Sequence, residues 1–210
     1  MSATIGGALS TGIQQLDSQL GGGVPAGQIV AFTAPPDTQS ELLVENLLAE
    51  RDTCYLSTFR SEREIREQFA PISETEQSLA VDQIDPRQLL MNAESFPTLP
   101  EGGNLIIDAT NELESFDRDT YATFLDTIAS RIREAGGIGL LVCFEEPTTP
   151  DGRGLTLRQA DLTWRLSLDV DSMGVATRLT VTKFRGGQPV GKPIKLELTD
   201  GVAVDTSRNI

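Results

Sequence analysis

Residues 10–32 read STGIQQLDSQLGGGVPAGQIVAF, and this stretch decides the fold that we expect. The three consecutive glycines at 21–23 and Pro25 indicate a turn, because glycine and proline are the strongest breakers of regular structure. The apolar run 29–32 that follows is typical of a buried strand. The sequence therefore predicts a glycine-rich turn that leads directly into a core strand.

Strand and helix patterns alternate beyond this stretch. The expected strands are 53–58, 104–108 and 138–144, and the expected helices are 40–50, 61–69 and 117–135. Ser61 and Glu64 have the spacing of a capping box, which favours a helix beginning at that point. Such alternation predicts an α/β fold with a mostly parallel central sheet that is covered by helices on both faces.

The last third of the chain has a different pattern. Apolar and polar residues alternate over 162–168, 177–184 and 193–198 with short turns between them, which predicts a C-terminal antiparallel meander. A length of 210 residues fits one domain. We divide residues 1–210 into an N-terminal lead segment (1–27), a parallel α/β core (28–145) and the meander (160–205). Residues 147–154 are rich in turn formers and are expected to form a mobile loop.

The opening stretch resembles the start of the RecA superfamily core, and in particular that of the KaiC-like and RadA-like proteins common in archaea. The residues that carry the resemblance are Ser10, Thr11, Gly12, Leu16, Asp17, Gly21, Gly22, Gly23, Pro25 and Gly27. The resemblance implies a P-loop NTPase fold over nearly the whole chain, which agrees with the alternation of elements.

A phosphate-binding loop of this fold reads G-x-x-x-x-G-K-[ST]. Its glycines let backbone amides surround the phosphates, its lysine reaches them, and its hydroxyl holds Mg²⁺. The corresponding residues here are Ala34, Pro35, Pro36, Asp37, Thr38, Gln39, Ser40 and Glu41. All four fixed positions are replaced, so we expect a degenerate Walker A motif.

These replacements change the charge where phosphate would bind. Ser40 replaces the lysine and removes a cation, and Glu41 replaces the hydroxyl and adds an anion. Two unit charges about 4 Å apart interact by about 4 kcal/mol at an effective dielectric constant near 20. ATP and Mg²⁺ are therefore not expected as cofactors. Thr38 and Glu41 also have capping-box spacing, so this segment is expected to begin a helix, with an intact but unusual nucleotide pocket as the alternative.

Other positions match the family only in part. KaiC-like ATPases carry two glutamates after the second core strand, where this chain has residues 58–61, including Phe59 and Arg60. Asp108 matches the Walker B aspartate that supports Mg²⁺, although an acid at a strand end is also an ordinary cap. Lys183 and Arg185 resemble the strand end that reaches a neighbouring subunit's nucleotide in KaiC-like rings. The alternative is a strand edge protected by charge.

Composition limits the classes of function. The formal net charge is −14, with only three lysines, which indicates a salt-adapted and, given the resemblance, archaeal host; an ordinary acidic protein is the alternative. The acidic surface argues against nucleic acid as a partner. The chain has no histidine, which removes the residue most used for acid-base catalysis near neutral pH. Cys54 and Cys143 lie far apart without metal-ligand spacing and are expected to be buried thiols. No apolar run is long enough for a membrane span or a signal peptide, so we expect a cytoplasmic protein.

Three functions remain at this stage. The first is a non-catalytic pseudo-ATPase that acts as a regulatory or scaffolding partner in signalling or gene regulation, and binds another protein or an active paralogue in a homo- or hetero-oligomer. In such a mixed ring, Lys183 and Arg185 would serve the paralogue's ATP site. The second is an atypical KaiC/RadA-like ATPase. The third is a recombination accessory, for which Arg153 and Arg158 are the only basic residues in the segment 147–158.

Overall fold

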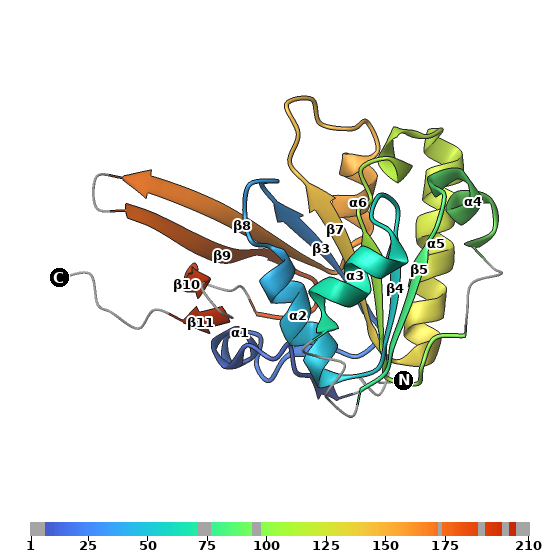
Figure 1. The fold of residues 1–210 in the computed structure, drawn as a ribbon. Coiled ribbons are helices and arrows are strands. Elements are labelled where there is room, and N and C mark those ends of the chain that lie inside the picture. The colour runs from blue at the N-terminus through green and yellow to red at the C-terminus, as the bar shows by residue number, and fades with distance from the viewer. Residues whose placement is uncertain are drawn as a thin grey trace.

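The computed structural model describes residues 7–70, 77–93, 98–171, 174–188, 192–198 and 202–204. A twisted sheet runs through the centre of the molecule, with helices on both of its faces (Figure 1). The α/β class and the C-terminal antiparallel strands expected from the sequence are both confirmed.

The main sheet contains nine strands in the described part of the chain, in the order β11-β10-β9-β8-β3-β7-β6-β4-β5. The strands are β3 (Gln28–Ala34), β4 (Thr53–Ser57), β5 (Leu79–Gln83), β6 (Asn104–Asp108), β7 (Ile138–Phe144), β8 (Leu162–Asp171), β9 (Gly174–Phe184), β10 (Ile194–Leu198) and β11 (Val202–Val204). Pairing is parallel from β5 to β8 and antiparallel from β8 to β11. A separate two-stranded sheet joins β1 (Ala8–Leu9) to β2 (Val24–Pro25) in the lead segment.

The helices divide between the two faces of the sheet. They are α1 (Gln14–Gln19), α2 (Glu41–Glu50), α3 (Glu62–Gln68), α4 (Pro86–Met91), α5 (Arg118–Ala135) and α6 (Arg153–Gln159), with a 3₁₀ turn η3 (Leu113–Ser115). The leucine, isoleucine and valine side chains that α1, α2 and α3 bury belong to one apolar cluster, and the leucine, isoleucine and aromatic side chains that α4, α5 and α6 bury belong to another. The sheet is therefore covered on both sides.

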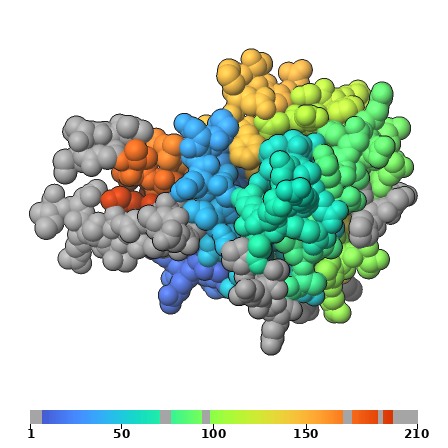
Figure 2. All heavy atoms as spheres, viewed as in Figure 1, coloured from blue at the N-terminus to red at the C-terminus, as the bar shows by residue number. Residues whose placement is uncertain are grey.

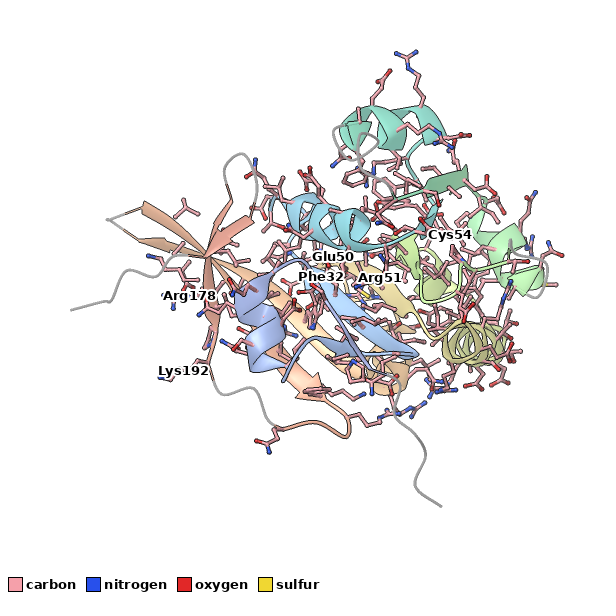
Figure 3. The ribbon with its side chains drawn as sticks, turned by 90° about the horizontal axis from the view of Figure 1, so that it is seen from below. Phe32, Glu50, Arg51, Cys54, Arg178 and Lys192 are labelled. Carbon is pink, nitrogen blue, oxygen red and sulfur yellow. The ribbon has the colours of Figure 1, made fainter. Side chains whose placement is uncertain are left out.

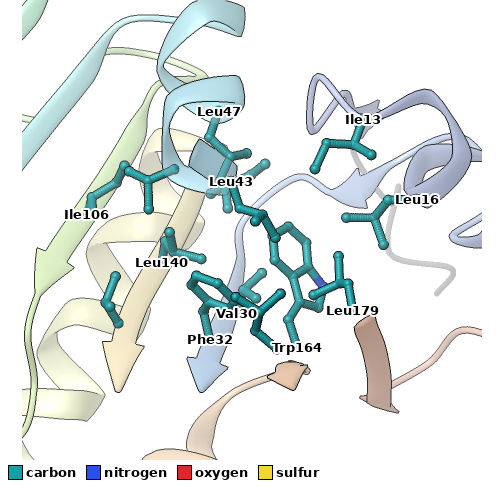
Figure 4. Close-up of a cluster of buried hydrophobic side chains, with 14 of the residues drawn as sticks. Ile13, Leu16, Val30, Phe32, Leu43, Leu47, Ile106, Leu140, Trp164 and Leu179 are labelled. Atoms are coloured by element: carbon teal, nitrogen blue, oxygen red, sulfur yellow. The ribbon is translucent and has the colours of Figure 1, made fainter. Parts of the chain in front are cut away.

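The central position of β3 in the sheet explains why its sequence is a continuous apolar run. Successive side chains of a strand point to opposite faces, and a strand covered on both faces buries them all. Val30 and Phe32 enter the cluster on the α2 face, while Ile29 and Ala31 enter the cluster on the α5 face. The ring of Phe32 meets Trp164 edge to face with centroids 6.5 Å apart, at the centre of the first cluster (Figure 4).

The lead segment is joined to the sheet by polar contacts. Thr11 donates from both its amide and its hydroxyl to one oxygen of Asp17, at 2.9 and 2.7 Å. Arg51, after α2, donates to the Asn104 side chain at 3.1 Å and to the carbonyl of Ser10. Figure 3 places Arg51 among the central elements, whereas Arg178 and Lys192 lie beside the C-terminal strands.

Some elements predicted from local sequence were confirmed, and other elements were not predicted. The capping box of α3 is formed, because Ser61 accepts from the amide of Glu64 and the Glu64 carboxylate accepts from the amide of Ser61. β5 and α4 were not predicted. The expected mobile loop 147–154 overlaps α6, which begins at Arg153 and buries that residue.

Both cysteine thiols are buried, as expected. Burial, followed by the charge of Asp82, raises the pKa of Cys54 to about 11. Burial and the charge of Glu114 raise the pKa of Cys143 to about 12. Both groups are therefore neutral thiols near pH 7.

Substitution of Gly137 tests the close approach between the turn before β7 and Gly103. A Cβ atom at position 137 would lie 1.7 Å from the carbonyl oxygen of Gly103, so the backbone must shift. We expect Gly137→Ala to lower the free energy of unfolding by about 2 kcal/mol in urea titrations. The matched control is Gly154→Ala in α6, where a Cβ meets nothing within 4 Å and should leave stability equal or slightly raised. Equal stability of the two variants would contradict this account.

Candidate functional site

The candidate site lies at the carboxyl ends of the parallel strands β3, β4, β6 and β7, which we call the carboxyl edge of the sheet. Strand register sets Ser57 opposite Asp108, Asp108 opposite Val142, and Ala34 opposite Phe144. In parallel α/β sheets, ligands bind outside the carboxyl ends of the strands. A pocket of about 500 Å³ occupies this edge, between the segment 35–40, the first turns of α2, the turn after β4, and the ends of β6 and β7.

The segment 35–40 connects β3 to α2 along one wall of the pocket. The amide and the hydroxyl of Thr38 both donate to the carbonyl of Pro35, at 3.2 and 2.7 Å. Helix α2 begins at Glu41 with Ser40 as its N-cap, and no side chain caps it. Ser40 and Glu41 both line the pocket.

The predicted capping box between Thr38 and Glu41 is wrong. A capping box needs its acidic residue at the third helical position, but Glu41 stands at the first. Thr38 therefore lies two residues before the N-cap, where its hydroxyl closes a local turn on Pro35 instead.

The backbone of this segment has an ordinary right-handed or extended conformation throughout. None of residues 34–41, all of which the structure describes, has a positive φ. Positive φ angles in the described residues belong to glycines elsewhere, among them Gly21, Gly22 and Gly23 of the turn before β3. An anion-binding nest of the αR-αL type needs a left-handed residue, so the segment does not form one of that type.

The floor of the pocket is an ion pair that the sequence did not predict. Asp108, at the end of β6, is 2% exposed, and its Oδ2 atom lies 2.5 Å from an Nη2 atom of Arg60. Tyr55 on β4 donates its hydroxyl to the same oxygen, and Arg60 also donates to the Tyr55 hydroxyl at 2.8 Å. The other terminal nitrogen of Arg60 donates to Gln68 at the end of α3. Arg60 thus crosses from the turn after β4 to the carboxylate of β6.

The electrostatics of these groups favour the ion pair. Burial opposes the charge of Arg60, but Tyr55 and Asp108 together raise the pKa of the guanidinium. Burial and then the charge of Asp108 raise the pKa of Tyr55 well above its usual value. Arg60 is therefore a fixed cation, and Tyr55 is a neutral hydrogen-bond donor.

An aromatic group closes the pocket beside this ion pair. The guanidinium of Arg60 lies 5.4 Å from the ring centroid of Phe59, which is 51% exposed. Phe59 meets Phe144 edge to face at 6.1 Å. Phe59 and Arg60 stand in the region where the KaiC-like family carries acids, and the structure gives them a cation and an apolar surface instead.

Lys183 and Arg185 lie away from this pocket, at the end of β9. The Lys183 amine donates to the carbonyls of Leu157, Arg158 and Ala160, so it caps the C-terminal end of α6. Burial, then the charge of Arg185, lowers the pKa of Lys183. Arg185 donates to the carbonyl of Arg158 and pairs with Asp161 at 3.4 Å. Their contact with a second subunit stays a prediction.

A second buried ion pair also escaped sequence reasoning. Arg153 donates through Nε to both oxygens of Glu114, at 2.9 and 2.8 Å, and Glu114 is fully buried. Thr156 donates to the same carboxylate at 2.5 Å. The pair joins η3 to α6. Arg153 is one of the two basic residues of the segment 147–158, but it is 7% exposed and lies in a helix, so it is poorly placed to contact DNA.

The described residues form neither a metal-binding cluster nor a membrane-spanning helix. No cluster of three or more cysteine or acidic side chains there could hold a metal ion. None of the helices formed by those residues has both the length and the apolar character needed to cross a membrane.

Comparisons with known proteins place the chain in a family. Residues 8–210 match the model of a family of unknown function, DUF7125. The chain belongs to this family. No curated protein matches the sequence. Among solved structures, it is similar to the KaiC-like protein PH0186 from the hyperthermophilic archaeon Pyrococcus horikoshii OT3, with a TM-score of 0.74 and 16% identity, covering 95% of this chain and 99% of that one. The DUF7125 chain therefore has a KaiC-like RecA fold.

Replacement of Arg60 tests the ion pair at the pocket floor. Removing one partner of a buried pair leaves an uncompensated charge, so we expect Arg60→Leu to lower the free energy of unfolding by about 3 kcal/mol. Adding Asp108→Asn should recover most of this loss, because it removes the stranded carboxylate. Chemical denaturation followed by circular dichroism measures both effects.

The control for this comparison is Arg63→Leu in α3. Arg63 pairs with Glu67 on the surface, where both side chains are more than half exposed. Its loss should change the free energy of unfolding by no more than about 0.5 kcal/mol. If Arg60→Leu costs no more than Arg63→Leu, the buried pair does not have the role assigned to it.

Proposed function

We propose that this protein is a non-catalytic member of the RecA/KaiC fold group, which acts through protein contacts as a regulatory or scaffolding partner in signalling or gene regulation. The observation that carries the proposal is the ion pair between Arg60 and Asp108. In an active enzyme of this fold, the aspartate at this position supports Mg²⁺. Here the cation beside the carboxylate is a guanidinium attached to the same chain.

The wall of the pocket supports the same conclusion. A triphosphate needs a lysine and a hydroxyl where this chain has Ser40 and Glu41, and it needs backbone amides held by left-handed residues. The Glu41 side chain lines the pocket and has no hydrogen bond to other described residues, so its charge faces the space that phosphate would occupy. The residues of this site therefore fit ATP and Mg²⁺ poorly, and we infer no hydrolytic step.

A role through contacts requires a folded surface rather than a reacting centre. Both apolar clusters are closed, and the Asp108 carboxylate is neutralised from within the chain. We therefore expect the chain to fold without nucleotide or metal. The partner that we propose is another protein or an active paralogue, met in a homo- or hetero-oligomer in the cytoplasm.

An atypical ATPase is the second candidate, and two observations favour it. The pocket of about 500 Å³ persists at the carboxyl edge, and Asp108 is retained. ATP would then have to displace Arg60 from Asp108 and bind beside Glu41. The recombination accessory is less favoured, because Arg153 is buried against Glu114 and leaves only Arg158 in that segment for DNA.

Calorimetric titration with ATP and Mg²⁺ in molar KCl separates these functions. We expect no measurable binding up to millimolar nucleotide, because Ser40 provides no cation and Glu41 repels phosphate. A micromolar dissociation constant for the natural sequence, weakened by Asp108→Ala, would overturn the proposal in favour of the ATPase.

The same assay tests the role of Arg60 in closing the site. A variant with Ala34→Gly, Asp37→Gly, Gln39→Gly, Ser40→Lys and Glu41→Thr restores the residues of a phosphate loop. We expect this variant to recover some nucleotide binding, and adding Arg60→Ser to strengthen it by about tenfold, which is about 1.4 kcal/mol. The matched control adds Arg63→Ser, which lies in α3 outside the pocket. Equal effects of the two arginine changes would show that Arg60 does not close the site.

A further inference from the structure

A second cavity lies at the same edge of the sheet, on the face covered by α6. Its volume is about 270 Å³, and it is formed by the end of β3, the first half of β8, the segment after β7 and α6. The segment after β7 rises above the sheet at the top of the view (Figures 1 and 2). Strand alternation separates this cavity from the first one, because Thr33 faces it while Phe32 faces the α2 side.

One wall of the cavity contains a guanidinium that is held in place. Arg153 is 7% exposed, and its Nε atom donates to both oxygens of Glu114. Its Nη2 atom donates to the carbonyl of Phe144 at 3.1 Å. Nη1 has no hydrogen-bond acceptor among the described residues. Arg153 thus presents donors to the cavity from a fixed position.

A second guanidinium faces the cavity without a partner. Arg165 on β8 is paired in register with Thr33 on β3, so the two side chains lie on the same face of the sheet. Arg165 is exposed, and no hydrogen bond or ion pair joins its side chain to any other described residue.

Two carboxylates, those of Glu145 and Glu146, line the same cavity. The backbone amide of Glu145 donates to the carbonyl of Ala34 at 2.9 Å, which fixes the position of this residue. The Glu145 carboxylate contacts no donor among the described residues. Glu146 accepts from the Asn111 side chain at 2.6 Å and keeps one carboxylate oxygen free of described partners. No ion pair joins either glutamate to Arg165. Opposite charges therefore share one small cavity and remain separated.

We propose that this cavity binds a small zwitterion, whose carboxylate meets Arg165 and Arg153 and whose ammonium group meets Glu145 and Glu146. Hydrogen bonds to charged guanidinium and carboxylate groups are stronger than those between neutral groups. A ligand that carries both charges can bind the arginines and the glutamates of the cavity at the same time. A volume of about 270 Å³ holds about nine water-sized groups at ~30 Å³ each, which is enough room for a simple amino acid. This site does not depend on the proposed function.

The test is a binding series followed by NMR or calorimetry on the full chain. The zwitterions are glycine, β-alanine and γ-aminobutyrate, which differ in the spacing of their charges, and acetate and methylammonium carry one charge each. We expect one zwitterion to bind at least about tenfold more tightly than either single ion, which is about 1.4 kcal/mol. Binding of acetate as tight as that of the best zwitterion, or no binding in the series, would overturn the proposal.

Variants locate the binding. Arg165→Gln and Glu145→Gln should each weaken the preferred zwitterion by at least about tenfold, or 1.4 kcal/mol, and abolish its advantage over acetate or methylammonium. Both residues are exposed, so thermal unfolding should confirm that these variants fold normally. The matched controls, Arg158→Gln and Glu50→Gln, change the same charges outside the cavity and should leave affinity unchanged. Equal effects of site and control variants would show that the ligand binds elsewhere or follows overall charge, and the proposal would be wrong.

Discussion

The chemistry of this protein depends on one buried carboxylate and its need for a cation. Asp108 is 2% exposed at the end of β6, and an ionised carboxylate in that position is costly unless a positive group lies beside it. Arg60 is the cation that meets this need, and Tyr55 and Gln68 hold the guanidinium in its orientation. Other features of the pocket follow from the position of Arg60. The guanidinium pairs with the carboxylate and lies 5.4 Å from the ring centroid of Phe59, and Glu41 lines the same pocket.

Strand register brings the two partners of this contact close together. Ser57 stands opposite Asp108 in the parallel pair β4 and β6, and Arg60 follows Ser57 by three residues, with its amide donating to the Ser57 hydroxyl at 2.9 Å. The backbone of Arg60 therefore lies at the carboxyl end of β4, beside the end of β6 where Asp108 stands. The same edge carries two cavities on opposite faces of the sheet. In the α2-side cavity Arg60 and Asp108 are paired with each other, whereas the charges lining the α6-side cavity include an arginine and a glutamate without described partners.

Sequence patterns predicted the elements that carry strong periodicity, and failed where the signal was short or distant. The central strands were found because burial on both faces makes them continuous apolar runs. β5 was missed because only Val81 of its five residues is buried, as suits an edge strand. α4 has six residues, too few for a helical period to be recognised. α6 was obscured by the turn-forming residues before it, and its N-cap is Gly152 rather than a serine, threonine, aspartate or asparagine.

The two capping boxes show the limit of local signals. Both have the correct spacing, but only that of Ser61 begins a helix at the required residue, since α2 starts two residues later than its own signal indicated. The ion pairs of Arg60 with Asp108 and of Arg153 with Glu114 join residues 48 and 39 positions apart, so no window of sequence contains them. The degenerate phosphate loop and the role of Asp108 are predictions from the resemblance. The cation that pairs with Asp108 could not be predicted without the register of the strands.

A tethered cation differs from a bound metal in one respect that bears on function. A magnesium ion enters and leaves with nucleotide, so a site built on it can exist in two states that a bound ligand selects. Arg60 cannot leave the chain, and its raised pKa keeps it charged at any physiological pH. The edge of the sheet around Asp108 consequently has no exchangeable charge of its own in this arrangement. Under the function that we propose, a change of state in this protein would come from contacts elsewhere on its surface, as in a protein that acts through partners.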